Sequence, residues 1–250
     1  MLWCSSSRKT RQLTDSPLMN RIFSTEHIAG TKKAPAMLVY ALALLGTIVF
    51  SGCSQHEQNP GDVRAEEIEL IDSADSIMRV LTIADPCDSL ILRDTSRTFS
   101  AKALLSENYD KLCSLMVATV THPSQDGVGI AGPQVGLNRR VVAVQRFDKA
   151  GEPFEVYPNI RIIWASDSLA NGPEGCLSVP DRREQVARST EIVIEYADMH
   201  ALRNADIPAG TAQTPDCNIP MVRDTVKGFT AVIFQHETDH LDGILYIDRL

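Results

Sequence analysis

The stretch Gln235-His236-Glu237-Thr238-Asp239-His240, close to the end of the chain, decides how the rest of the sequence is interpreted. Its two histidines are four residues apart, about one helical turn, so both imidazoles reach the same side of a helix. Two imidazoles can bind one divalent cation there, while the carboxylate of Glu237 projects beside it. The stretch therefore predicts a helix that carries a metal site of the hydrolytic type.

A catalytic site of this type needs a third protein ligand and one open position. Downstream, the acids that remain are Asp242 and Asp248, and neither stands at a familiar spacing from the histidines. Upstream, Glu174-Gly175-Cys176-Leu177-Ser178 places a cysteine in an extended or turn segment. A buried core residue or half of a disulfide is the ordinary role of such a cysteine. In this context Cys176 is the better candidate for the third ligand.

A third stretch is rich in glycine: Gly127-Val128-Gly129-Ile130-Ala131-Gly132-Pro133-Gln134. It also matches the dinucleotide-binding pattern Gly-x-Gly-x-x-Gly. The context opposes that interpretation, because a polar segment precedes it where a strand should be, and Pro133 and Gly136 interrupt the helix that should follow. A loop whose backbone approaches a peptide, and whose Gln134 amide meets a carbonyl oxygen, suits the stretch better.

The three stretches together resemble the peptide deformylase family, whose signature motifs are Gly-x-Gly-x-Ala-Ala-x-Gln, Glu-Gly-Cys-Leu-Ser and Gln-His-Glu-x-Asp-His. The resemblance covers roughly Ile77 to Leu250. One position departs from it, since Gly132 replaces the second alanine of the first motif, a change expected to loosen the loop. The resemblance implies a metal-dependent hydrolase that removes the N-formyl group from N-formylmethionyl peptides and releases formate.

The resemblance also implies the roles of individual residues. Cys176, His236 and His240 would bind the metal, and Glu237 would act as general acid and base. The implied ion is Fe²⁺, with Zn²⁺ or Ni²⁺ as substitutes. Because iron beside an exposed thiolate is easily oxidised, an extracytoplasmic location favours zinc.

Further residues are assigned to the substrate by the same resemblance. Gln134 and the backbone amide of Leu177 would hold the developing oxyanion. Arg183 corresponds to a position that contacts the substrate backbone, although a solvated charge is its ordinary role. An apolar pocket for the methionine side chain is implied at positions that otherwise read mostly as core: Val128, Gly129, Phe229, Val232 and Ile233.

The beginning of the chain predicts where the protein works. Residues 37–50 carry no charge, follow Lys32 and Lys33, and precede Ser51-Gly52-Cys53, a pattern typical of a secretory signal with a lipoprotein-type cleavage site. Resemblance to lipoprotein signals implies that Cys53 receives the lipid. We therefore expect a leader over 1–53, a polar tether over 54–75 and a catalytic domain over 76–250, anchored in the bacterial cell envelope. The alternative is a cytoplasmic protein.

Charge and cysteine content extend this interpretation. The chain has a net charge of −8, and removal of residues 1–53 would leave −12, which disfavours nucleic acid as a partner. In an oxidising envelope Cys87 would pair most plausibly with Cys113. Cys217 lies in the stretch Asp198 to Lys227, which is longer than a short hairpin connection and is expected to be a tolerated surface insertion. The oligomeric state is not predicted.

Short apolar runs separated by turn signals predict the fold class. Val141–Val144 and Glu191–Tyr196 are examples of expected strands. We expect an α+β fold in which antiparallel sheets pack around the central motif-bearing helix. Two other functions stay open: a non-catalytic lipoprotein that binds formyl peptides, and a metalloprotease or amidase with another substrate. Cys176 as third ligand disfavours the protease, and the presence of Glu237 disfavours the binder.

Overall fold

The computed structural model describes residues 59–205 and 219–250. The predicted leader, the expected lipid attachment site at Cys53, and Cys217 lie outside these residues. None of the helices in the two ranges has the length and apolarity needed to cross a membrane.

The described strands pair into three antiparallel sheets, ordered β1-β2-β3, β4-β7-β8 and β5-β6. In chain order the strands are β1 (Gly129–Ala131), β2 (Val141–Gln145), β3 (Phe154–Pro158), β4 (Arg161–Ala165), β5 (Leu169–Cys176), β6 (Val179–Ser189), β7 (Glu191–Ala197) and β8 (Met221–Lys227). The strands expected at 141–144 and 191–196 are β2 and β7.

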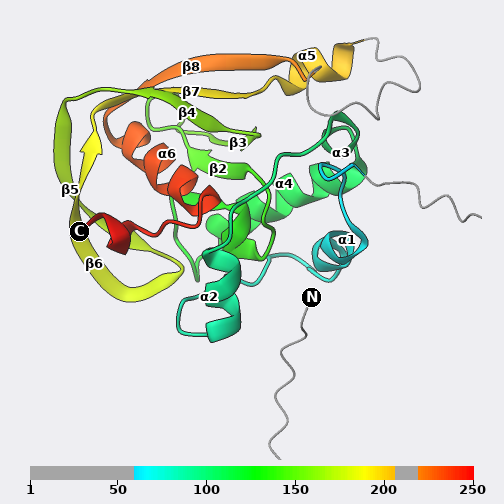
Figure 1. Ribbon diagram of the computed structural model, residues 1–250, viewed down its shortest axis with the longest axis horizontal. Helices are drawn as coiled ribbons and strands as arrows, with labels where there is room; N and C mark the ends of the chain where they lie inside the picture. Colours follow the sequence, from blue (N-terminus) through cyan, green and yellow to red (C-terminus); the bar gives the residue numbers. More distant parts are fainter. Residues whose placement is uncertain (1–58, 206–218) are drawn as a thin grey trace, which may run out of the picture. The chain divides into compact units, whose positions relative to one another are not determined.

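The helical elements follow the same numbering. They are α1 (Ala65–Asp72), α2 (Pro86–Leu92), α3 (Ala101–Leu104), α4 (Glu107–Val120), α5 (Met199–Asn204), α6 (Gly228–Leu241) and the short 3-10 turns η1 (Gly132–Val135) and η3 (Tyr246–Arg249). Figure 1 shows α6, the predicted motif helix, enclosed by strands of all three sheets. Mixed helices and antiparallel sheets confirm the predicted α+β class.

The position of α6 follows from apolar side chains that converge on it from two sheets. Val142 and Val144 of β2 and Ile192 of β7 pack with Ala231 and Phe234 of the helix, and all five are fully buried. Each Å² of apolar surface that this packing removes from water stabilises the fold by roughly 25 cal/mol. The motif helix is therefore held between sheets rather than on the surface.

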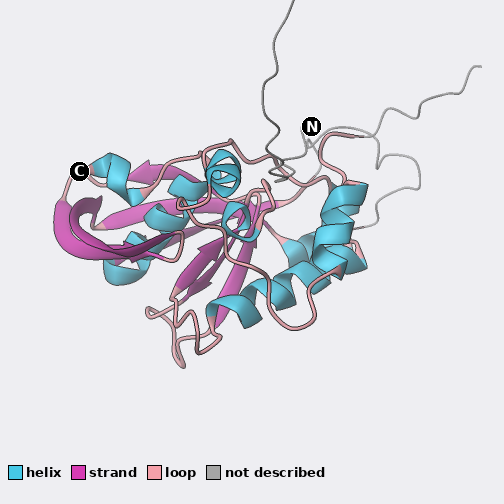
Figure 2. Ribbon diagram, turned by 90° about the horizontal axis from the view of Figure 1, so that it is seen from below, coloured by secondary structure: helices cyan, strands magenta, loops and turns pink. Residues whose placement is uncertain are grey.

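The other face of β2 packs against α4. Leu112 and Met116, one turn apart on α4, share a buried cluster with Val141 and Ala143 of β2. Residues along a strand alternate between its two faces, so β2 is buried on both. In Figure 2 the strands cross the middle of the molecule with helices on both sides.

The folded domain begins earlier than the predicted boundary at residue 76. Ile71 of α1 belongs to the same core cluster as α4. The fully buried guanidinium of Arg139 donates to both carboxylate oxygens of Glu67 at 2.8 Å and to the carbonyl oxygens of Pro60 and Asp62. Residues 59–75 are therefore not a tether, because an unpaired buried guanidinium would be costly without them.

Two further expectations are corrected. Cys113 carries a free thiol packed against the α4 core rather than a disulfide with Cys87, and burial raises the pKa of that thiol to about 11. Gly132 does not loosen a loop, since a Cβ at this position would lie 2.7 Å from the carbonyl oxygens of both Leu137 and Arg139. The chain requires glycine there because the backbone folds back on itself.

Candidate active site

Cys176, His236 and His240 come together where the end of β5 meets the C-terminal half of α6. One ligand atom from each residue lies within 4.8 Å of the other two, and the imidazole Nε2 of His240 is 3.3 Å from the Sγ of Cys176. The register of β5 against β6 shifts between Gly175 and Cys176, so the pairing is irregular at the strand end that carries the cysteine. No other cluster of three such side chains occurs among the described residues.

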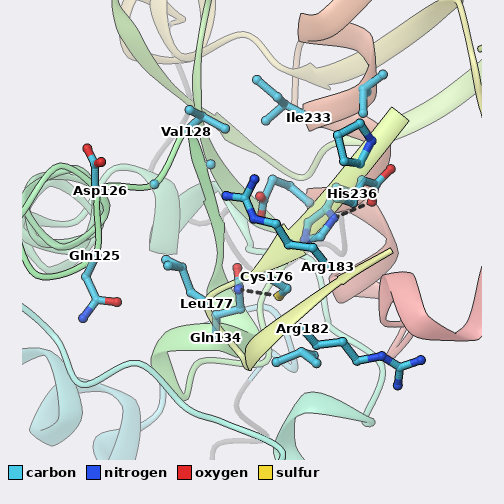
Figure 3. Close-up of a pocket in the computed structure, with 18 of the residues that line it drawn as sticks. Gln125, Asp126, Val128, Gln134, Cys176, Leu177, Arg182, Arg183, Ile233 and His236 are labelled. Carbon is cyan, nitrogen blue, oxygen red and sulfur yellow. Dashed lines mark hydrogen bonds and ion pairs between the residues drawn. The ribbon is translucent and has the colours of Figure 1, made fainter. Parts of the chain in front are cut away.

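The ring of His236 is fixed by a carboxylate that sequence reasoning left without a role. Its Nδ1 lies 2.8 Å from the Oε2 of Glu174 (Figure 3). Glu174 in turn accepts two hydrogen bonds from the buried guanidinium of Arg188, at 2.7 and 3.0 Å. A carboxylate that accepts from one imidazole nitrogen leaves the other free to bind a metal. The position of Glu174 in the cysteine motif was the sequence signal for it.

Burial alone would raise the pKa of Glu174, but the hydrogen bonds and charges of His236 and Arg188 lower it to about 2. The carboxylate is therefore ionised at neutral pH and remains an acceptor for the His236 ring.

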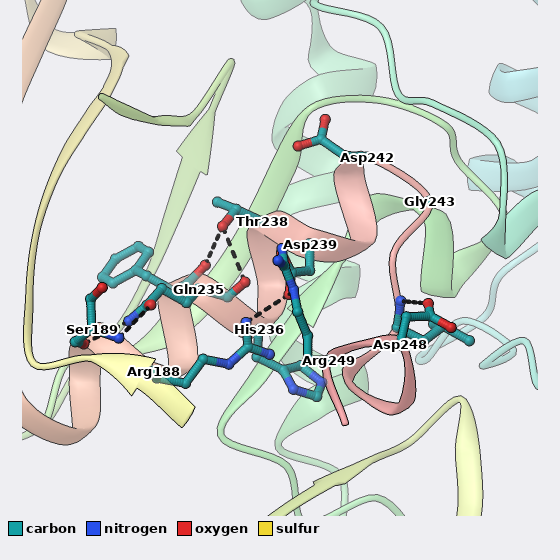
Figure 4. Close-up of polar contacts among 12 residues, drawn as sticks. Arg188, Ser189, Gln235, His236, Thr238, Asp239, Asp242, Gly243, Asp248 and Arg249 are labelled. Carbon is teal, nitrogen blue, oxygen red and sulfur yellow. Dashed lines mark hydrogen bonds and ion pairs between the residues drawn. The ribbon is translucent and has the colours of Figure 1, made fainter. Parts of the chain in front are cut away.

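The same arginine connects the site to the far side of α6. Arg188 also donates to Asp239 at 2.7 Å, and Asp239 accepts two hydrogen bonds from Arg249 (Figure 4). Gln235 completes the attachment of the helix to β6, since its side-chain amide pairs with both the N–H and the carbonyl of Ser189. The motif helix is thus held in register with the hairpin that carries Glu174 and Cys176.

Glu237 lies beside the cluster and is almost completely buried, at 4% exposure. Burial raises the pKa of its carboxyl to about 7. Its Oε2 has no hydrogen-bond partner among the described residues. A Cβ at Gly129 would lie 2.5 Å from the Oε1 of Glu237, so β1 can pass this close to the carboxylate in its present position only with glycine there. Gly129 therefore makes room for Glu237 in addition to lining the cavity.

Gln134 is placed by its own carbonyl oxygen. The Oε1 accepts from the backbone N–H of Ala131 at 2.8 Å, which directs the Nε2 toward the cluster. There the Nε2 donates to the hydroxyl of Ser178 at 3.2 Å and to the Sγ of Cys176 at 3.5 Å. The glycine-rich stretch, expected as a loop, forms β1 and η1, and this turn holds the amide in place.

A cavity of about 660 Å³ opens over these residues. Figure 3 shows Cys176, His236 and Arg183 on one side of it and Val128 and Ile233 on another. Its walls include every residue that the sequence assigned to the substrate: Val128, Gly129, Gln134, Leu177, Arg183, Phe229, Val232 and Ile233. His240 is fully buried and is not among the lining residues, so it supports the site from below.

Part of the expectation about the apolar stripe was wrong. Phe229 is 57% exposed rather than core, because it stands at the first turn of α6 beside the cavity mouth, where its ring meets that of Phe147. Gln125 and Asp126 also line the mouth and were missed, since nothing in their sequence distinguishes them from an ordinary turn. Neither downstream acid is part of the cluster: Asp242 pairs with Arg140, and Asp248 hydrogen-bonds to the N–H of Leu245.

Comparison with known proteins agrees with this geometry. A family model described as polypeptide deformylase matches residues 77–205 and 211–250. Peptide deformylase from Leptospira biflexa is 31% identical over 182 residues, which cover 70% of this chain and 88% of the relative. The chain belongs to the peptide deformylase family. Peptide deformylase 2 from Gloeobacter violaceus is 34% identical to this deformylase over 161 residues, 64% of this chain and 74% of the relative.

Solved structures are similar over the same region. A class I type b peptide deformylase from Acinetobacter baumannii with Met-Ala-Ser bound aligns with a TM-score of 0.54 and 32% identity, and covers 70% of this deformylase and 98% of its own chain. The same protein with actinonin bound aligns with a TM-score of 0.55 and 31% identity, over 70% and 99% of the two chains. The family match begins at residue 77, so α1 and the Glu67 contact lie outside it.

Proposed function

We propose that this deformylase uses one divalent metal ion to remove the formyl group from N-formylmethionyl peptides, and that it does so as a lipid-anchored protein of the cell envelope. The observation that carries the reaction is the cluster of Cys176, His236 and His240, with the almost completely buried carboxyl of Glu237 beside it.

The three side chains fit a single ion. Ligands at bond lengths of about 2.0–2.3 Å around a tetrahedral ion lie roughly 3.3–3.8 Å apart. The Sγ of Cys176 lies 3.3 Å from the Nε2 of His240, and all three ligand atoms lie within 4.8 Å of one another, so binding one ion would draw the widest pair together by at most about 1 Å. One thiolate and two imidazoles suit Fe²⁺, Zn²⁺ and Ni²⁺. When bound, such an ion supplies Lewis acidity and lowers the pKa of a water in its open position.

The residues of the chain supply the remaining chemistry. Burial raises the pKa of the Glu237 carboxyl, so this group holds a proton more readily than an exposed carboxyl, which suits it to accept the proton of the attacking water and deliver it to the departing amine. The Nε2 of Gln134 and the backbone N–H of Leu177 are the donors proposed for the formyl oxygen. Attack on the formyl carbon and cleavage of its C–N bond give formate and a free amino terminus.

The cavity suits a peptide that begins with a methionine. Val128, Val232 and Ile233 offer an apolar wall, and the exposed Arg183 brings a cation to the cavity. Met-Ala-Ser bound to the Acinetobacter baumannii protein supports a peptide ligand at this site.

Formate release from formyl-Met-Ala-Ser by the full chain, loaded in turn with Fe²⁺, Ni²⁺ and Zn²⁺, tests the reaction. We expect Glu237→Gln to lower the rate by about 10²- to 10⁴-fold, because the amide has the same shape and cannot carry the proton. Glu69→Gln, which removes a carboxylate from the exposed side of α1, is the matched control. Binding of the peptide without release in parent and variant alike would replace the enzyme with a formyl-peptide-binding protein.

The location is tested separately. The signal-like pattern before Cys53 supports the anchor, and labelling of the host with a radioactive fatty acid should mark the parent but not Cys53→Ala. Equal labelling of the two chains would return the protein to the cytoplasmic alternative.

A further inference from the structure

The last residues of the chain pack against residues that line the cavity. Tyr246, at the start of η3, is 1% exposed and shares a small core with Leu245 and Val179, against which Cys176 also packs. Tyr246 is not among the residues that line the cavity. It therefore lies behind the active-site wall, where it can support the site without touching a substrate.

The ring of Tyr246 lies against one of the proposed metal ligands. It stacks on the imidazole of His236, with ring centroids 5.9 Å apart and planes inclined by 23°. Glu174 fixes this imidazole through a hydrogen bond in its plane, but one such bond leaves the ring free to rock about it. A flat aromatic surface parallel to the imidazole restricts that rocking.

The hydroxyl of Tyr246 holds a different part of the site. It donates to the backbone carbonyl oxygen of Arg182 at 2.9 Å. The residue before, Asp181, has a left-handed backbone with φ of +59°, which is unfavourable for a residue with a Cβ. Strain of this kind persists only where surrounding contacts fix the chain. The next residue is Arg183, whose side chain runs over Gly175 and lines the cavity.

The turn that carries Tyr246 is itself fixed at both ends. Asp248 accepts from the N–H of Leu245 at 2.8 Å and pairs with Arg93 of the α2 C-terminus. Arg249 donates twice to Asp239 on the motif helix. The tyrosine is thus held from two directions and is part of neither the metal cluster nor the cavity.

We propose that Tyr246 is a positioning residue with two separable effects: its ring orients His236 for the metal, and its hydroxyl holds the Arg182 backbone so that the Arg183 wall faces the substrate. The effect on the substrate rests on the proposed function, whereas the effect on metal binding does not depend on it.

Two variants separate the effects. Tyr246→Phe keeps the ring and removes the hydroxyl, so we expect KM for formyl-Met-Ala-Ser to rise about three- to tenfold, as for the loss of one hydrogen bond, while kcat and the metal Kd stay within about twofold. Tyr246→Met keeps apolar volume and removes the ring. We expect its metal Kd, measured with Zn²⁺ against a chromogenic chelator, to rise about tenfold or more.

Tyr157→Phe is the matched control, because Tyr157 is equally buried and its hydroxyl is bonded to Arg146, away from the cluster. It should lower Tm and leave KM and the metal Kd unchanged. A Tyr246→Phe protein that loses Tm as the control does but keeps the parent KM would overturn the hydroxyl's role. A Tyr246→Met protein that binds Zn²⁺ as tightly as the parent would overturn the ring's role. Formate release by the parent reports on the proposed function alone, and the metal Kd is read without substrate.

Discussion

Substitution of Gly129 by alanine should disable Glu237 while the fold survives. The added Cβ would stand 2.5 Å from the Oε1 of Glu237 and 2.9 Å from its Cδ and Cγ. Ordinary contacts between such atoms need about 3.5 Å, so the carboxylate has to move by about 1 Å. A displacement of that size at a reacting group costs about 10²-fold in rate, or about 2.7 kcal/mol of transition-state stabilisation.

Stability should change little, because the atoms that must give way are the end of a flexible side chain rather than backbone. Rotation of the Glu237 side chain away from its present position costs about 0.5–1.5 kcal/mol. Replacement of glycine by alanine returns about 0.4–1 kcal/mol, since the unfolded chain becomes less free. The two contributions nearly cancel. We therefore expect the unfolding free energy to stay within about 1 kcal/mol of the parent.

The assay compares three proteins for formate release, Zn²⁺ affinity and unfolding in urea. Gly172→Ala is the control, because a Cβ at that position on β5 would meet no atom within 4 Å. We expect kcat to fall in Gly129→Ala alone, with Zn²⁺ affinity retained in all three. Full activity in Gly129→Ala would refute the argument that the close approach of β1 fixes the carboxylate. A large loss of stability would show that the backbone, and not the side chain, yields.

The other predictions concern two further buried carboxylates, those of Glu67 and Glu174. Burial raises the pKa of Glu67, but hydrogen bonds from Arg139 and from the Arg64 backbone, with their charges, bring it below its usual value. The ionised Glu67 therefore contributes fully to the free energy of unfolding above about pH 4.3, the pKa of an unfolded-state glutamate. That contribution is lost as the pH falls through the lower pKa of the folded state. Glu67→Gln should lower the free energy of unfolding by about 3–5 kcal/mol at pH 7. Urea unfolding at pH 7 and pH 3 should show that the difference between variant and parent is smaller in acid. Glu174→Gln should weaken Zn²⁺ binding about 10- to 100-fold by chelator competition, because it changes the acceptor that orients His236, and an unchanged affinity would refute that.

The boundary of the domain shows where sequence reasoning fell short. The polar composition after Cys53 suggested a tether up to residue 75, yet α1 lies within this stretch and Glu67 meets Arg139 across 72 residues of chain. Each of these residues alone reads as a solvated surface charge. Only the folded chain, in which the guanidinium is fully buried, shows that the two require each other.

The sequence by itself was enough to single out Cys176, His236 and His240 as the candidate metal cluster, because residue identity and spacing along one helix are local properties. Histidines four apart must share a face, and a cysteine in a distinctive motif can be recognised without knowing its neighbours. Contacts between distant segments were decided only by tertiary structure. The Glu174 carboxylate reached His236 by pairing of β5 with β6, and Tyr246 reached the same ring through the docking of η3. The need for glycine at position 129 became visible only in the packing of β1 against α6. There the side chain of Glu237 occupies the space that a Cβ would need.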